Sequence, residues 1–184
     1  MRPSKVSDKE LFERLTEVFR RRGYDGASYA ELMDATGLVK ASLYHRFPGG
    51  KAEMVGAIQS EVDRHFGEYV LAPAVEEGDP RQRARRIARR LREFYDSGRA
   101  WCLLDTLTLA DNRATLVRAK KSMEFWVDRF ARLGRDAGLS AGVARKRAEE
   151  AVAAIEGGLV VARVLKNRRP FLCVLAGLPK KLTE

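Results

Sequence analysis

The chain has 184 residues, of which 45% are hydrophobic and 33% charged, and its formal net charge is +10. This length and composition exclude a chain that needs disulfide staples, because about 70% of the unfolded surface can be buried in an ordinary core. The N-terminus lacks the apolar core of a signal peptide, and no apolar run approaches the roughly 18 residues of a membrane span. We therefore expect a soluble, cytoplasmic protein with no membrane contact.

The positive charge favours a polyanionic partner, but its distribution weakens that inference. Residues 1–51 hold ten Lys and Arg against seven Asp and Glu, whereas residues 101–184 hold sixteen against nine. Most of the excess therefore lies in the second half of the chain, and local patterns have to identify the partner.

The first predicted helix covers residues 8–22. Its apolar residues recur at the spacing of one helical face: Leu11, Leu15, Val18 and Phe19. Three arginines then suit the negative end of the helix dipole, and Gly23 is a suitable stop.

Two short helices joined by a tight turn follow. Ser28 and Glu31 have the spacing of a capping box, which predicts a helix start at Ser28. Gly37 ends that helix, and residues 40–45 form the next one before a Pro-Gly-Gly segment prevents continuation. Two short helices around a turn that contains Gly form the helix-turn-helix layout, which we assign to residues 28–47.

The rest of the chain also has helical periodicity and no credible strand. Further helices are predicted at residues 51–71, 80–95, 101–110, 112–137, 140–167 and 171–178. The fold class is therefore all-α, with about nine helices. We place a helix-turn-helix three-helix domain at residues 1–51 and a second helical domain at residues 52–184.

The second helix of a helix-turn-helix enters the major groove by its N-terminal end. Lys40 can meet a phosphate or a guanine edge, Ala41 allows close approach, and Ser42 can donate to a base or a phosphate. Tyr44 and His45 can reach backbone oxygens. Similar short helices occur in many all-α proteins, so the residues alone leave open both DNA binding and a helical protein-interaction module.

Residues 11–55 resemble the N-terminal domain of the TetR family of transcriptional repressors. The matching features are Phe19 with Gly23, Ser28, Gly37, Ser42-Leu43-Tyr44, Phe47 and Lys51. The resemblance implies a homodimeric regulator whose C-terminal domain binds a small-molecule effector, which releases the repressor from a palindromic double-stranded DNA operator.

Residue by residue, the resemblance implies DNA contacts from a defined set. Phosphate contact is implied for Ser28 or Tyr29 and for Lys51, and base or backbone contact for Lys40, Ala41, Ser42, Tyr44 and His45. The chain departs from the family at Val39, where a small capping residue is usual, and at Arg46, which could add a phosphate contact.

An effector pocket is expected among the middle helices. Its candidate residues are Phe66, Tyr69, Phe94, Trp101, Asp105, Thr108, Trp126 and Phe130. In the predicted helix at 101–110, Trp101 and Asp105 lie one turn apart and could offer stacking and a polar anchor. Aromatic residues at helical spacing are more often core than pocket, so both interpretations stay open.

The dimer interface is expected on the helix at residues 140–167. Its candidate residues are Val152, Ile155, Gly157, Gly158 and Leu159. The two glycines would let a partner helix approach closely, while the apolar residues supply area. The alternative is that this face is intramolecular core.

The sequence gives little reason to predict an enzyme. It contains two histidines, no glycine-rich phosphate loop and no metal-ligand cluster, so we predict no catalytic residue, metal or cofactor. Cys102 and Cys173 are expected to be reduced, buried residues, with a redox-sensing pair as the alternative. The Arg-rich segment 81–99 is the surface that an interaction module would use for an acidic partner.

Overall fold

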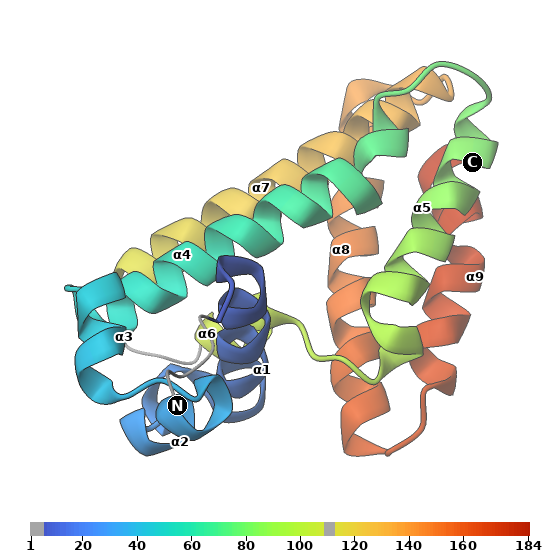
Figure 1. The fold of residues 1–184 in the computed structure, drawn as a ribbon. Coiled ribbons are helices and arrows are strands. Elements are labelled where there is room, and N and C mark those ends of the chain that lie inside the picture. Colours follow the sequence, from blue (N-terminus) through green and yellow to red (C-terminus); the bar gives the residue numbers. More distant parts are fainter. Residues whose placement is uncertain (1–5, 109–112) are drawn as a thin grey trace. The chain divides into compact units, whose positions relative to one another are not determined.

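A computed structural model describes the backbone of residues 6–108 and 113–184, and their side chains except those of residues 106–108. The regular elements within these ranges are all helical, including nine α-helices, which confirms the predicted fold class (Figure 1). The chain forms two compact units: unit 1 comprises Met1–Asp63 and Leu103–Ala119, and unit 2 comprises Arg64–Cys102 and Lys120–Glu184. No helix in the described ranges is long and apolar enough to cross a membrane.

Unit 1 is built mainly on four helices from the start of the chain and one short helix from its middle. These are α1 (Asp8–Gly26), α2 (Tyr29–Thr36), α3 (Lys40–Arg46), the greater part of α4 (Gly50–His65), and α6 (Leu103–Thr108). Helix α1 packs against α2 and α6. Its predicted apolar face is buried in a core that also holds Leu32, Leu43 and Met54. Gly23 has φ +69° and breaks the helical path as predicted, although one more turn follows to Gly26.

Helix α4 is shorter than the predicted segment 51–71. It ends at His65 and is followed by a π-helical turn, η1 (Phe66–Val70), and a 3-10 turn, η2 (Ala72–Ala74). Pro73 lies inside η2 and has no N–H to donate to a continuing α-helix.

Unit 2 contains α5 (Pro80–Phe94), the short 3-10 turn η3 (Asp96–Gly98), most of α7 (Arg113–Asp136), α8 (Ala141–Val164) and α9 (Arg169–Thr183). Helix α9 packs against both α5 and α8 (Figure 1). Aromatic rings form much of the core. Phe66 stacks on Trp126 with a centroid distance of 4.1 Å, and Tyr95 meets Phe171 edge-on at 5.9 Å.

Helix α9 extends beyond the predicted segment 171–178 and continues through Pro179 to Thr183. Proline inside a helix removes one backbone hydrogen bond, so other contacts must hold the last turn. Leu182 is 1% exposed, and the hydroxyl of Thr183 donates to the carbonyl of Pro179 at 2.8 Å. Burial of the terminal leucine therefore overrides the local stop signal.

Candidate nucleic-acid interface

The second and third helices are positioned by local signals that the structure reproduces. The Ser28 hydroxyl accepts from the Glu31 N–H at 3.2 Å, and the Glu31 carboxylate accepts from the Ser28 N–H at 3.2 Å, so the predicted capping box is present. Gly37 has φ +70° and donates its N–H to the Met33 carbonyl at 2.8 Å. A side chain at this left-handed position would be strained, which is why glycine suits the turn.

The turn is also fixed from inside unit 1. The buried Thr36 hydroxyl donates to the Leu32 carbonyl at 2.6 Å and accepts from the Leu38 N–H at 3.3 Å. From α1, the Arg14 guanidinium donates to the Ala35 carbonyl at 3.2 Å. These bonds satisfy the end of α2 and set the direction in which α3 leaves it.

Helix α3 has one buried and one exposed face. Leu43 is fully buried. The side chains of Lys40, Ala41, Tyr44 and His45 are exposed, and Ser42 is half-buried. The predicted contact residues of α3 thus lie on the surface of one short helix, and Leu43 on its opposite face packs into the core of unit 1.

Two tyrosines and a lysine form a compact cluster beside this surface. The rings of Tyr29 and Tyr44 stack at 5.3 Å, and the Lys40 ammonium lies 5.2 Å from the Tyr29 centroid. Burial, together with the hydrogen bond to Tyr44, raises the pKa of Tyr29 to about 12, so its hydroxyl stays protonated at neutral pH. Gly50, with φ +66°, leaves room for this hydroxyl, because a Cβ there would lie 2.9 Å from it.

Lys51 is more constrained than the prediction assumed. Its ammonium donates to the carbonyls of Tyr24 at 3.0 Å and Ala27 at 3.2 Å, and it lies 5.0 Å from the Tyr24 ring centroid. It therefore fastens the end of α1 to the start of α4, and one of its three donor protons remains for a phosphate. Arg46 pairs with Asp8 at 2.7 Å.

Val39 is an exposed residue at the start of α3 that was not among the predicted contact residues. It occupies the N-cap of α3 without a side-chain hydrogen bond, as expected, but its side chain is also 61% exposed. An exposed branched apolar side chain at the leading end of such a helix can contact a thymine methyl group. The sequence signal that could have indicated this exposed contact is a β-branched apolar residue at a helix-cap position, where a polar residue is usual.

The structure does not assemble the predicted effector pocket as one site. Phe66, Trp126 and Phe130 are buried in the core of unit 2, and Phe94 packs edge-on against Phe66 at 5.1 Å. Half-buried Tyr69 donates its hydroxyl to Glu93, and this hydrogen bond raises the pKa of Tyr69. These aromatic rings serve mainly as core.

The polar part of that prediction needs correction. Trp101 precedes α6, so it does not share a helical turn with Asp105, which belongs to unit 1. Residues 101 and 102 are non-helical, so the helix starts two residues later than predicted. The side chain of Thr108 lies outside the described residues.

The predicted dimer-interface residues lie mostly inside unit 2. Val152, Ile155 and Leu159 are buried, with Ile155 fully so. A Cβ on Gly158 would lie 3.3 Å from the Cα of Phe171 in α9, so Gly158 serves close packing within the chain. These four residues are therefore core. Gly157 alone is exposed, with open space where its Cβ would be.

One of the two cysteines differs from the prediction. Cys102 is buried, and the Tyr95 hydroxyl donates to its sulfur at 3.7 Å, but Cys173 is exposed. Among the described residues, no group of three or more His, Cys, Asp or Glu could hold a metal ion.

Comparison with known proteins gives consistent results. Residues 11–58 match the family model described as bacterial regulatory proteins, tetR family. The HTH-type transcriptional regulator LmrA of Bacillus subtilis is 22% identical over 96% of both chains. A TetR transcriptional regulator from Legionella pneumophila has a TM-score of 0.84 at 18% identity, over 98% of both chains. A cysteine mutant of the TetR family regulator CifR, solved with operator DNA, has a TM-score of 0.78 at 20% identity, over 97% of this chain and 98% of that one.

The family model covers α2, α3 and parts of α1 and α4, and so includes the exposed surface of α3. The relatives and the solved structures extend the similarity over nearly the whole chain. Residues 11–58 thus match the TetR family of bacterial regulatory proteins, and nearly the whole chain is similar to regulators of that family.

Proposed function

We propose that this protein is a sequence-specific DNA-binding transcriptional regulator, a repressor that a small-molecule effector releases from its operator. The observation that carries DNA binding is the exposed face of α3, which Leu43 anchors from the core. Lys40 and Ala41 lie at its leading end, and Tyr44 and His45 follow one turn later on the exposed surface. In a helix-turn-helix this end enters the major groove. The operator complex of a structurally similar regulator supports the same use of the fold.

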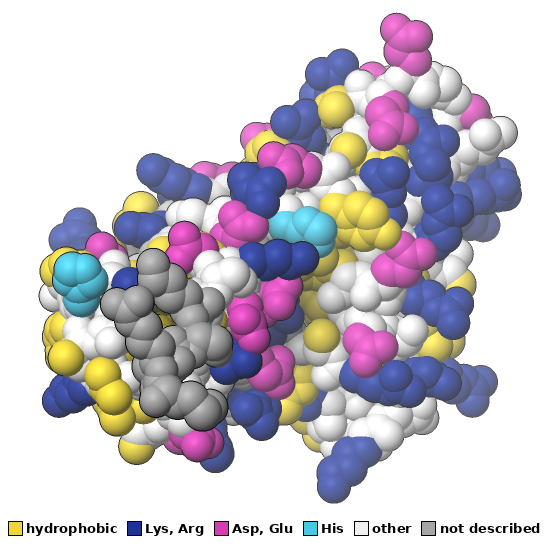
Figure 2. Space-filling view, viewed as in Figure 1, with side chains coloured by type: hydrophobic (Ala, Val, Ile, Leu, Met, Phe, Trp, Pro, Cys, Tyr) yellow, Lys and Arg dark blue, Asp and Glu magenta, His cyan; other side chains and the backbone are white. Residues whose placement is uncertain are grey.

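The alternative of a protein-interaction module is less well supported. It depends on the Arg-rich face of α5, where basic side chains gather in unit 2 (Figure 2). Several of these arginines are already engaged: Arg86 pairs with Glu76 at 2.7 Å, Arg81 with Glu184 at 2.8 Å, and Arg90 donates to the Tyr69 carbonyl. Internal pairing weakens the face as a site for an acidic partner.

The test is a fluorescence-anisotropy titration of the protein with DNA from upstream of its own gene, at several stated salt concentrations. Tight binding that depends on a palindrome and falls steeply with salt is expected, because phosphate contacts release counterions. Equal affinity for a scrambled duplex of the same composition would contradict sequence-specific recognition.

Replacing Val39 with Ser should separate its two roles. Serine supplies the missing N-cap, so the free energy of unfolding of unit 1 should rise by about 1 kcal/mol. Loss of the exposed methyl groups should lower discrimination for thymine by about 1 kcal/mol at one operator position. Urea unfolding and binding to operators substituted at single positions measure the two effects. Unchanged base preference at every position would remove Val39 from the reading surface.

A buried glutamine supports the binding of a small-molecule effector. Gln59 on α4 is 1% exposed, and its amide has no hydrogen-bond partner within the described part of the chain. A buried polar group without a partner is costly, and native proteins usually keep one where a ligand or water can satisfy it. Gln59 therefore supports a polar effector or bound water beside α4.

Gln59→Leu should raise the free energy of unfolding by about 1 kcal/mol, because it removes an unsatisfied amide at nearly constant volume. Urea denaturation of the effector-free protein measures this. Gln82→Leu, at an exposed glutamine on α5, is the matched control and should change stability by less than about 0.5 kcal/mol. A clear loss of stability in Gln59→Leu would show that the amide is already satisfied.

The proposed regulator is a homodimer whose two copies meet through the exposed face of α8. Ala153, Gly157 and Val161 are exposed and lie four residues apart, so they share one helical face. Gly157 leaves open space for another helix, and Val161 is 43% exposed. This face replaces the buried set that the sequence suggested, and pairing of two reading heads is what half-site recognition requires.

Val161→Glu should weaken the dimer by at least about a hundredfold, because each copy would bury an unpaired carboxylate at the contact. Sedimentation velocity over a range of protein concentrations measures the shift. Val117→Glu, at a valine that is 48% exposed on α7, is the matched control. If both variants sediment like the wild type, the contact lies elsewhere.

A further inference from the structure

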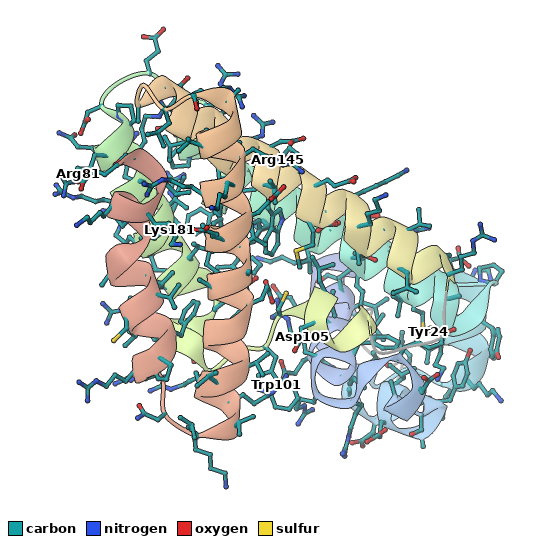
Figure 3. The ribbon with its side chains drawn as sticks, turned by 180° about the vertical axis from the view of Figure 1, so that it is seen from behind. Tyr24, Arg81, Trp101, Asp105, Arg145 and Lys181 are labelled. Carbon is teal, nitrogen blue, oxygen red and sulfur yellow. The ribbon has the colours of Figure 1, made fainter. Side chains whose placement is uncertain are left out.

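Unit 2 contains an open cleft of about 620 Å³, whose lining includes Trp101 of the predicted effector residues. It lies where residues 98–101 meet the end of α8 and the turn into α9, and Trp101 forms part of its wall (Figure 3). Its size is within the range of pockets that hold small molecules. The residues most relevant to its chemistry are Arg99, Trp101, Arg163, Lys166 and Arg168.

The cleft is strongly basic. Four of its lining residues are cationic, and none of the described residues that line it is acidic. Arg99 forms only a 3.4 Å ion pair with nearby Asp96, at exposed positions where such pairs are weak. A concave surface of one charge raises the local concentration of ions of the opposite charge.

The same cleft offers a flat apolar surface. The Arg163 guanidinium lies 5.0 Å from the centre of the Trp101 ring. A guanidinium can hold a carboxylate through two parallel hydrogen bonds, while an indole ring stacks on planar groups. A planar acid matches both features together.

Lys166 follows the end of α8 in a left-handed backbone conformation. Lys166 has φ +49°, and the N–H groups of Lys166 and Asn167 donate to the carbonyls of Arg163 and Ala162, which is the Schellman ending of a helix. Glycine is the usual residue there, because a side chain in this conformation costs roughly 1 kcal/mol. A lysine at this position keeps that strain and places a cation in the lining of the cleft.

We propose that this cleft binds a small planar organic anion, an aromatic carboxylate, with its carboxylate among Arg163, Lys166 and Arg168 and its ring against Trp101. This site is separate from the DNA-reading surface and does not depend on the proposed function.

Isothermal titration of the full chain with naphthoate at low salt tests the proposal. Naphthoate should bind, whereas neutral naphthylmethanol and inorganic phosphate should each bind at least about tenfold more weakly. Lys166→Gly should weaken naphthoate binding about tenfold, the effect of one lost charge-assisted hydrogen bond. Its melting temperature should stay the same or rise, because glycine relieves the backbone strain.

Arg132→Gln, at an exposed arginine on α7 outside the cleft, is the matched control and should bind naphthoate like the wild type. The proposal is overturned if naphthoate does not bind, if Lys166→Gly binds it as tightly as the wild type, or if naphthylmethanol or phosphate binds equally well. The experiment contains no DNA, so failure of the proposed function would not affect its outcome.

Discussion

Ala41→Glu is expected to lower the affinity for operator DNA by at least about a hundredfold while leaving the protein folded. Ala41 is exposed in the first turn of α3, where the structure has no acidic residue and no side-chain cap. A carboxylate near a helix N-terminus stabilises the helix by about 0.3–1 kcal/mol. The same carboxylate would face phosphates and base edges in the major groove, and loss of base contacts alone costs about 1–3 kcal/mol.

Each dimer presents this change twice, once in each half-site, so the two penalties combine. Anisotropy titration with operator DNA measures the loss, and a thermal melt followed by circular dichroism confirms the fold. Ala141→Glu is the matched control, because Ala141 is also an exposed alanine in the first turn of a helix, α8 of unit 2. Operator affinity within about threefold of the wild type would exclude α3 as the reading helix.

The helix-turn-helix could be predicted from the sequence because its determinants act over a few residues. The capping box of Ser28 and Glu31 and the left-handed turn at Gly37 are set by adjacent backbone groups, and both are present in the structure. The exposure of Val39 was not predicted, because a cap position read alone says nothing about what covers the side chain.

The second half of the chain was harder to predict, because contacts between distant residues decide which side chains are buried and where helices end. Gly157 and Gly158 are adjacent in the sequence, yet Gly157 faces solvent and Gly158 packs against Phe171 of α9. Adjacent helical residues point about 100° apart, and periodicity cannot choose which face meets the same chain. Pro179 likewise predicts a helix end, and only the burial of Leu182 shows why the helix continues.

Arg83 is the clearest case of such hidden packing. The Arg-rich segment 81–99 was considered as a surface for an acidic partner, yet Arg83 is 3% exposed. Its Nε donates to the Pro73 carbonyl at 2.9 Å, and its Nη2 donates to the Ala74 carbonyl at 2.6 Å and to the Asp136 carboxylate at 2.7 Å. One side chain thus ties α5 to the η2 turn and to the end of α7, all within unit 2.

Arg83→Met is expected to lower the free energy of unfolding by about 3–5 kcal/mol, because methionine keeps most of the buried stem but leaves two carbonyls and a carboxylate without their donor. At about 2–4 °C per kcal/mol for a chain of this size, the melting temperature should fall by roughly 10 °C. Arg85→Met, at an exposed arginine two residues away, should change stability by less than about 0.5 kcal/mol. If calorimetry finds the two variants equally stable, the buried bonds of Arg83 contribute no more than its alkyl stem, and the polar link between α5 and α7 is not what stabilises unit 2.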